Sequence, residues 1–297
     1  MFREYCTLSD RAYLAKLLAM HESLMQHSSE PFALNVLAMD RETFVILSDM
    51  ELPNVIVLPL AAFENALQMD HVKKSRSRTE YFWTCASSLM QYLMAWKGVS
   101  LTYLDADLMF FSDPKVVFDE IGERSIAITP HRFPAHRKHM ERNGIYNVAW
   151  VTAKNSKTGH LCISRWAAQC REWCFHKNEA GKFGDQLYLD TWPTDYPGEV
   201  CVIQNPGVNL APWNVDGYVI SADSSGPLVD GVPVVFYHFH EFEHREKLTN
   251  YKLRIAEKKH IYEPYVDAWE RASLRIYAQE KVMAARQSEI ETQGQRA

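Results

Sequence analysis

The chain has 297 residues, 47% of them hydrophobic and 23% charged, so it can bury the core of one large or two small globular domains. Its net charge of −5 gives no general reason to bind nucleic acid. The N-terminus lacks the apolar segment of a signal peptide, and no apolar run approaches the about 18 residues of a membrane span, so we expect a soluble, cytoplasmic protein.

The first part of the sequence alternates between strand and helix patterns. Strands are expected at residues 5–9, 32–38 and 54–58, and helices at residues 11–25 and 43–47. Ser9 or Asp10 is the expected N-cap of the first helix. This alternation predicts an α/β fold with a mostly parallel sheet covered by helices, and ligands at the carboxyl ends of the strands.

A basic segment, residues 70–78, precedes a long helix expected at residues 79–96 and ended by Gly98. Clustered Lys and Arg side chains usually form a solvated surface. They are also unfavourable at a helix N-terminus, which attracts anions. The segment is therefore either a solvated surface or part of a site that holds a diphosphate.

The stretch from Leu101 to Pro114 places two carboxylates, Asp105 and Asp107, between two apolar runs. In a strand they would point to the same face, because side chains alternate. Burying two carboxylates without a cation costs several kcal/mol. Oxygen ligands suit Mg²⁺ or Mn²⁺, so the stretch predicts a divalent metal site. The alternative is a strand followed by a solvated turn.

The rest of the chain continues the α/β pattern. Helices are expected at residues 116–121 and 161–176, and strands at residues 125–129, 146–152, 201–204 and 234–239. On the last strand His238 and His240 share a face, as the two aspartates do. A histidine on an apolar strand is more often a core residue than a ligand, so both interpretations stay open for this pair.

The six cysteines show no spacing typical of a disulfide framework, which fits a reducing compartment. Cys170, Cys174 and His176 look superficially like a zinc set. Their spacing is not that of a known zinc site and the segment has a helical pattern, so we expect core packing there.

The composition changes near residue 243. Residues 245–286 hold ten Lys or Arg against six Asp or Glu, interspersed with apolar residues. We expect a domain at 1–242 and a C-terminal helical extension and tail at 243–297, disordered after about Gln287. The extension could contact an anionic membrane peripherally, or pack on the domain or on a second copy in a homo-oligomer.

Five separated segments resemble the GT-A fold glycosyltransferases, and within them the retaining glycogenin/galactosyltransferase-like group of nucleotide-diphospho-sugar transferases. The segments are Leu8–Tyr13, Tyr103–Leu108, Tyr146–Ala149, Gly184–Gln186 and Phe236–Glu241. They occur in the family's order and span most of the chain. The resemblance implies a single GT-A (Rossmann-like) domain with a mixed, mostly parallel sheet.

The resemblance also implies roles for individual residues. Asp10 would bind the uracil edge and Tyr13 would stack on its ring, with Leu8 in the same segment. The donor sugar would lie along Asn147. Asp185 and Gln186 would hold sugar hydroxyls. Asp105 would contact both the metal and the ribose, and Asp107 and either His238 or His240 would bind the metal. Arg78 would contact the diphosphate.

Two departures from the family pattern affect these expectations. Ala149 replaces the usual Gly and is expected to crowd the donor sugar. The histidine segment lacks the Gly-x-x-Lys-Pro-Trp continuation, and with it the Lys that contacts the diphosphate. Arg245, Lys247 or the Arg76 and Arg78 pair would have to replace that Lys.

Residues and resemblance together predict an enzyme that uses Mn²⁺ or Mg²⁺ to move a sugar, with retention, from a UDP-sugar to a glycan, lipid-linked or protein acceptor. The loop of residues 131–143, rich in His, Arg and Lys, is an expected acceptor region. A sugar-phosphate nucleotidyltransferase is one alternative, although the first strand is not followed by a Gly-rich loop. A non-catalytic nucleotide-sugar-binding subunit is the other.

Overall fold

The computed structural model describes residues 1–294, and side chains as far as residue 286. A seven-stranded sheet lies at its centre, with the strand order β3-β2-β1-β4-β7-β6-β8. The strands are β1 (Arg3–Ser9), β2 (Phe32–Ala38), β3 (Val55–Pro59), β4 (Leu101–Leu104), β6 (Ile126–Pro130), β7 (Tyr146–Ala153) and β8 (Val200–Val202). Within it, β7 alone runs antiparallel to its neighbours, so the expected mixed, mostly parallel sheet is confirmed.

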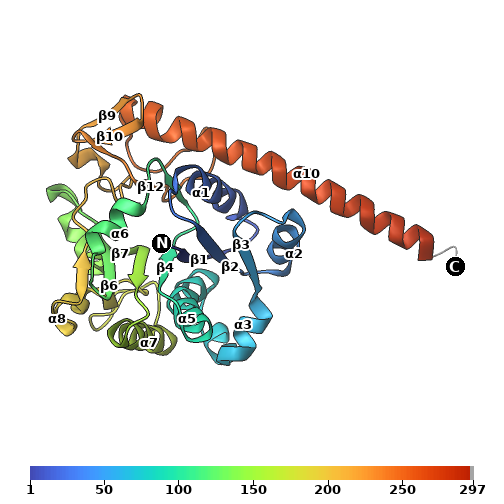
Figure 1. The fold of residues 1–297 in the computed structure, drawn as a ribbon, viewed down its shortest axis with the longest axis horizontal. Helices are drawn as coiled ribbons and strands as arrows, with labels where there is room; N and C mark the ends of the chain where they lie inside the picture. The colour runs from blue at the N-terminus through green and yellow to red at the C-terminus, as the bar shows by residue number, and fades with distance from the viewer. Residues whose placement is uncertain (295–297) are drawn as a thin grey trace.

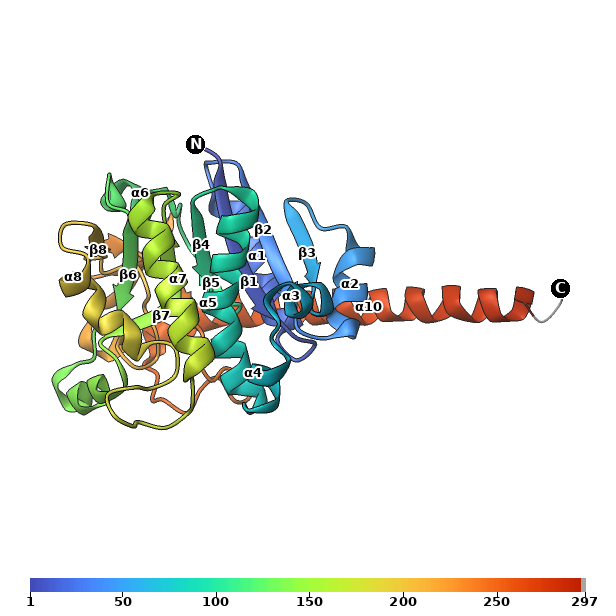
Figure 2. The same ribbon diagram turned by 90° about the horizontal axis from the view of Figure 1, so that it is seen from below.

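Helices cover both faces of this sheet (Figures 1 and 2). One face carries α1 (Leu14–His27), α2 (Arg41–Met50), α6 (Lys115–Ile121) and α10 (Glu263–Gly294); the other carries α3 (Leu60–Leu67), α5 (Arg78–Lys97) and α7 (Lys157–Glu172). Each layer has its own apolar core against the sheet. Because the central strands are covered on both faces, they are mostly apolar; in β2 all residues are buried and only Asn35 is polar.

Two smaller sheets complete the fold. The pair of β5 (Leu108–Phe110) and β12 (Phe236–His238) is antiparallel and brings together segments far apart in the sequence. The other sheet contains β9 (Ile220–Asp223), β10 (Gly226–Val229) and β11 (Val232–Pro233). The remaining short helices are α4 (Asp70–Lys74), η1 (Ala135–Asn143), η2 (Leu187–Thr191), α8 (Trp192–Asp195), η3 (Val215–Gly217), α9 (Ile255–Glu257) and η4 (Lys258–Tyr262).

Three local expectations are wrong. The N-cap of α1 is Tyr13, because Asp10 closes the preceding turn by accepting the Tyr13 amide at 3.0 Å. Asp105 and Asp107 lie in a turn between β4 and β5, because the chain leaves the central sheet there to pair with β12. Helix α10 continues to Gly294, where a disordered tail was expected after about Gln287; residues 295–297 lie outside the described part.

Helix α10 packs along α1 and then projects beyond the domain (Figure 1). Of its buried residues, Ala272 and Ile276 belong to the same core as α1 and the sheet, whereas Tyr265, Val266 and Ala268 pack in a separate cluster with β12. No helix in residues 1–294 combines the length and the apolar character needed to cross a membrane.

Candidate active site

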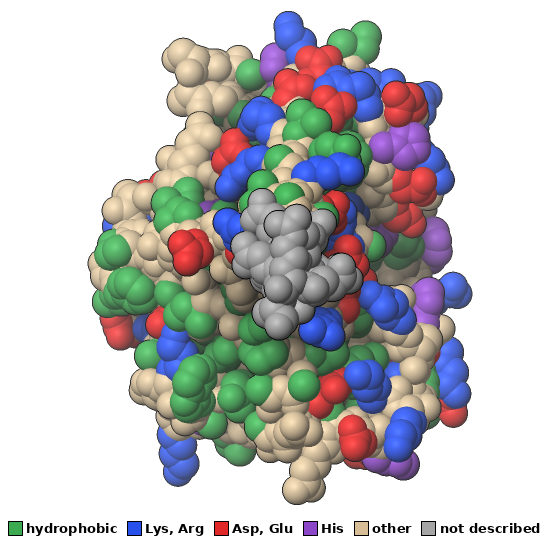
Figure 3. Space-filling model, turned by 90° about the vertical axis from the view of Figure 1, so that its right-hand side faces the viewer, with side chains coloured by type: hydrophobic (Ala, Val, Ile, Leu, Met, Phe, Trp, Pro, Cys, Tyr) green, Lys and Arg blue, Asp and Glu red, His purple; other side chains and the backbone are tan. Residues whose placement is uncertain are grey.

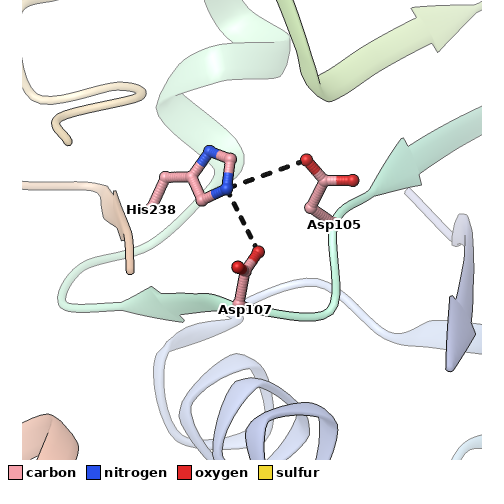
Figure 4. A group of neighbouring side chains, drawn as sticks. All are labelled: Asp105, Asp107 and His238. Carbon is pink, nitrogen blue, oxygen red and sulfur yellow. Dashed lines mark ion pairs between the residues drawn. The ribbon is translucent and has the colours of Figure 1, made fainter. Parts of the chain in front are cut away.

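Two carboxylates and one imidazole converge where the central sheet meets the β5–β12 pair (Figure 4). Asp105 follows β4, Asp107 precedes β5, and His238 lies on β12 opposite Leu108. The His238 Nε2 atom is 3.1 Å from Asp107 Oδ1 and 3.9 Å from Asp105 Oδ2. The backbone fixes this geometry, since the Phe239 amide donates to the Asp107 carbonyl at 2.9 Å.

Burial and the charges of the neighbouring groups shift the pKa of each of the three residues. Burial raises the pKa of Asp105 to about 6, with His238 acting against this shift and Asp107 adding to it. Burial opposes ionisation of Asp107 as well, but the charge and hydrogen bond of His238 hold its pKa well below its usual range. Burial would lower the pKa of His238; Asp107 and Asp105 outweigh that effect and raise it.

This set of atoms fits a divalent cation. Among the described residues it is the one group of three or more His, Cys, Asp or Glu with potential ligand atoms within 4.8 Å of one another. Two carboxylate oxygens and an imidazole nitrogen suit Mn²⁺ or Mg²⁺. A bound ion would displace the proton that His238 shares with the two carboxylates. Cys170 and Cys174 are buried in the apolar core, as expected.

A cavity of about 490 Å³ adjoins this cluster, between the β1–α1 connection, the start of α5, β7 and β12. Eleven residues that the sequence analysis assigned to the site line it, whereas Arg76, Arg245 and Lys247, suggested as replacements for the missing Lys, do not. The eleven are Leu8, Asp10, Tyr13, Arg78, Asp105, Asp107, Asn147, Asp185, Gln186, His238 and His240. Their individual roles stay predictions.

The two histidines differ in position. His238 is buried beside the aspartates, whereas the His240 side chain is 44% exposed, with Nε2 3.7 Å from Glu241 Oε1. Both rings lie against Trp213. The geometry therefore favours His238 as the metal ligand.

Arg78 is the residue of the basic segment that reaches the cavity. Its Nη2 and Nε atoms donate to Asp10 Oδ2 at 2.6 and 3.1 Å. The helix it begins has a capping box formed by Ser77 and Glu80, so the first-turn amides have partners despite the nearby cations. Arg76 donates instead to backbone carbonyls at the end of α7.

A tight turn presents Asp185 and Gln186. Gly184 has a φ of +52°, and a Cβ atom there would meet the Trp83 ring at 3.3 Å. The Asp185 carbonyl accepts from Trp166 Nε1 at 2.8 Å, and Gln186 Nε2 donates to the Asn143 carbonyl at 2.8 Å. Burial and the charge of Asp105 raise the pKa of Asp185 to about 8.

Asn147 lies where the pairing of β6 with β7 shifts register. Its Nδ2 atom donates to His131 Nε2 at 3.2 Å, and its Oδ1 atom accepts from the Ala149 amide at 3.0 Å. Asn147 and Val148 line the cavity, whereas Ala149 is buried in the core. The structure therefore gives no support to the expected crowding of the sugar by Ala149.

Sequence reasoning missed several residues of this region. The cavity wall includes Thr79, Phe82, Trp83 and Ala86, whose i, i+3, i+4, i+7 spacing on α5 could have indicated one face. Tyr103 donates to Asp105 Oδ1 at 3.1 Å. Lys16, three residues after Tyr13, could have been noticed in the sequence, because it is a lysine among the apolar residues of α1.

The fold is that of the GT-A glycosyltransferases. The galactosyltransferase LgtC, solved with donor and acceptor sugar analogs, matches with a TM-score of 0.54 and 13% identity over 93% of this chain and 95% of its own. Mouse xyloside xylosyltransferase 1 matches with a TM-score of 0.52 and 14% identity, over 81% and 98%. The glycosyltransferase GlyE of Streptococcus pneumoniae TIGR4 matches with a TM-score of 0.51 and 15% identity, over 94% and 64%.

At the level of sequence, the chain belongs to the family of two uncharacterized proteins of Bacillus subtilis (strain 168), YfnD and YfnF. It is 30% identical to YfnD over 273 residues, covering 88% of this chain and 87% of YfnD. It is 32% identical to YfnF over 249 residues, covering 80% and 81%. No family model matches the chain.

Proposed function

We propose that the protein is a metal-dependent glycosyltransferase that moves a sugar from a nucleotide-diphosphate donor, a UDP-sugar, to a glycan, lipid-linked or protein acceptor. The observation that carries the proposal is the Asp105, Asp107 and His238 cluster in the wall of a 490 Å³ cavity on a GT-A fold. A divalent ion held by these three residues supplies positive charge that stabilises a departing diphosphate.

The nucleoside end of the donor would lie near the β1–α1 connection. There Asp10 offers a buried carboxylate that can accept from a base N–H, and Tyr13 offers an aromatic face in the cavity wall. Leu8 adds apolar contact. Arg78, paired with Asp10, lies where it can add charge toward the phosphates.

The sugar would lie between β7 and the Gly184 turn. Asp185 and Gln186 would hold its hydroxyl groups, and Asn147 would lie along it. With a pKa of about 8, Asp185 is largely protonated at neutral pH and can donate as well as accept. In its ionised form it would stabilise oxocarbenium-like charge on the sugar. The family resemblance implies retention of configuration. If configuration is retained, we infer a front-face displacement, because none of these residues is an obvious covalent nucleophile for a double displacement.

The acceptor would approach from the side of η1. This segment, within the basic loop of residues 131–143, connects to the sugar region through the hydrogen bond from Gln186 to the Asn143 carbonyl. We also infer a reducing, cytoplasmic location, because all six cysteines are free and buried.

The test is manganese-dependent release of UDP from a panel of UDP-sugars. Asp107→Ala should lower the rate by about 10²-fold or more, since a ligand of the charge-stabilising ion is lost. Its circular dichroism spectrum should not change. The matched control is Asp113→Ala, which removes an acid of the same segment that does not line the cavity.

Full activity of Asp107→Ala would contradict the proposal. UDP binding with manganese but no turnover of any UDP-sugar would instead support the non-catalytic nucleotide-sugar-binding subunit. Release of pyrophosphate from a sugar phosphate and a nucleoside triphosphate would support the nucleotidyltransferase.

A further inference from the structure

Lys16 is a buried cation without a charged partner. It lies in the first turns of α1 and is 7% exposed. Its Nζ atom lies 4.1 Å from the centroid of the Tyr13 ring. Within the described part of the chain it makes no ion pair and no hydrogen bond. Burying an unpaired ammonium group costs several kcal/mol, so its position requires an explanation.

The surroundings of Lys16 include the wall of the cavity and the carboxylate of Asp107. The carboxylates whose charge acts on Lys16 are Asp107, Glu243 and Asp10, and Lys16 in turn acts on His238 and His240. Tyr13, whose ring it contacts, lines the cavity. Lys16 is not one of the residues that line the cavity; it lies behind the Tyr13 ring, close enough to Asp107 and Asp10 to interact with their charges.

A second unpaired polar group lies in the same region. The Tyr265 hydroxyl, from the first turn of α10, is buried and has no hydrogen-bond partner in the described structure. Its ring stacks on Phe239, next to His238, at a centroid distance of 3.5 Å. Burial raises the pKa of the Tyr265 hydroxyl, and the nearby Asp107 and Tyr13 groups raise it further. The region around Asp107 thus contains three polar groups without a hydrogen-bond partner in the described structure: the Lys16 ammonium, the Tyr265 hydroxyl and the His238 Nδ1 atom.

The cations that the sequence suggested for the diphosphate are engaged elsewhere. Arg245 pairs with Asp267 and Glu270, and Lys247 pairs with Glu243. Neither lines the cavity. Arg78 lines it but is already paired with Asp10. Lys16, by contrast, forms no ion pair within the described residues, although Asp107, Glu243 and Asp10 lie near it.

The balance of charge then indicates what Lys16 would bind. The two carboxylates would neutralise a divalent ion held between Asp105 and Asp107, and Lys16 would then add one positive charge that no ion pair offsets. We propose that Lys16 binds the phosphates of the nucleotide, offsetting their charge from α1 rather than from the segment after His238. This inference rests on the proposed function and names a phosphate-binding residue of that site.

The experiment compares nucleotide binding by calorimetry, in the presence of manganese, for the wild type and Lys16→Met. Methionine keeps the length of the side chain and removes its charge. We expect about tenfold weaker binding of UDP, a smaller loss for UMP and no change for uridine, because the effect depends on phosphate. Lys16→Arg should restore UDP binding to within a few-fold of the wild type. Lys115→Met, on α6 and away from the cavity, is the matched control.

The possible outcomes distinguish the inference about Lys16 from the proposed function. If the wild type binds UDP with manganese and Lys16→Met binds it equally well, the inference about Lys16 is wrong and the proposed function stands. If Lys16→Met loses uridine and UDP binding equally, Lys16 merely supports the Tyr13 ring. A wild type that binds no UDP with manganese overturns the proposed function and this inference with it. Should Lys16→Met not fold, the same comparison on Lys16→Gln decides.

Discussion

Burial of the Asp185 carboxyl in the site makes the fold less stable as the pH rises. Its carboxyl is buried near Asp105, and its pKa is raised to about 8 from a usual value of 3.8. A raised pKa in the folded state means that the folded protein binds the proton more tightly than the unfolded chain. The contribution of the protonated Asp185 carboxyl to the stability of the fold is therefore fully present below about pH 4 and is lost as the pH rises to about 8.

We predict that Asp185→Asn raises the free energy of unfolding at pH 8 by about 1–3 kcal/mol and removes part of the loss of stability between pH 5 and pH 8. The same variant should lose most glycosyl transfer. Chemical denaturation at several pH values measures the first effect and UDP release the second. The control is Glu51→Gln, an exposed acid far from the cavity. A variant that is less stable than the wild type at pH 8 would contradict the prediction.

For single residues, the sequence predicted which side chains line the cavity but not their ion pairs or pKa values. Asp10 and Tyr13, or Asp105 and Asp107, are close in the chain, so short motifs locate them. The pairing of Arg78 with Asp10, the raised pKa of Asp185 and the isolation of Lys16 depend on neighbours from other elements. Those neighbours are not visible in one local stretch.

Among the elements, the turn at Gly184 controls where Asp185 and Gln186 point. Gly184→Ala faces two costs: a φ of +52° that L-residues disfavour, and a Cβ atom 3.3 Å from Trp83 Cε3. Gly181 lies in the same connection with a φ of +72°, but a Cβ atom added there would have no other group within 4 Å.

We predict that Gly184→Ala lowers stability by about 1–2 kcal/mol and reduces turnover about tenfold or more, because Asp185 shifts with the turn. Gly181→Ala should show only the backbone cost of about 1 kcal/mol and normal turnover. Thermal unfolding and UDP release distinguish the two. Equal effects of both substitutions would show that the contact with Trp83 has no influence on the site.

The sequence predicted elements best where local signals bound them. Residues 32–38 form β2 as expected, because Pro31 and Asp40 flank a run in which Asn35 is the one polar residue. The turn at Asp105 to Asp107 resembles a strand in the sequence, because two apolar runs with alternating acids fit one strand equally well. The break depends on pairing with β12, more than 120 residues later, which is a tertiary effect.

For the whole molecule, helix α10 decides how far the folding unit extends. Tyr265 packs on Phe239 and Phe242, and Trp269 packs on Phe242. The expected division at residues 242 and 243 separates these partners, and it stays a prediction.

A chain shortened to residues 1–242 should therefore be unfolded or aggregated, because each lost large apolar contact costs about 1.5–3 kcal/mol. A chain that ends at Arg286 should unfold at nearly the temperature of the full chain and keep its activity. Circular dichroism melting of the two shortened chains measures this. A cooperative melt of residues 1–242 would establish the division proposed from composition.

The expected membrane contact of the C-terminal helices also stays a prediction. Basic and acidic side chains alternate on the face around the end of α10 (Figure 3). Several of them are paired, as in Arg271 with Glu22 and Arg286 with Asp49. Composition alone predicted a basic extension; the pairing partners on α1 and α2 could not be read from it.

The cluster of Asp105, Asp107 and His238 lies where the short turn between β4 and β5 connects the central sheet to the β5–β12 pair. Asp105 is held by the central sheet, whereas the other two belong to the β5–β12 pair. An ion bound there acts as a removable cross-link, so chelation should speed amide hydrogen exchange in β12 more than in β1. By reciprocity, a change that opens the β5–β12 pair would weaken binding of the ion. If the proposed function holds, release of the nucleotide product would then be coupled to local opening of the fold.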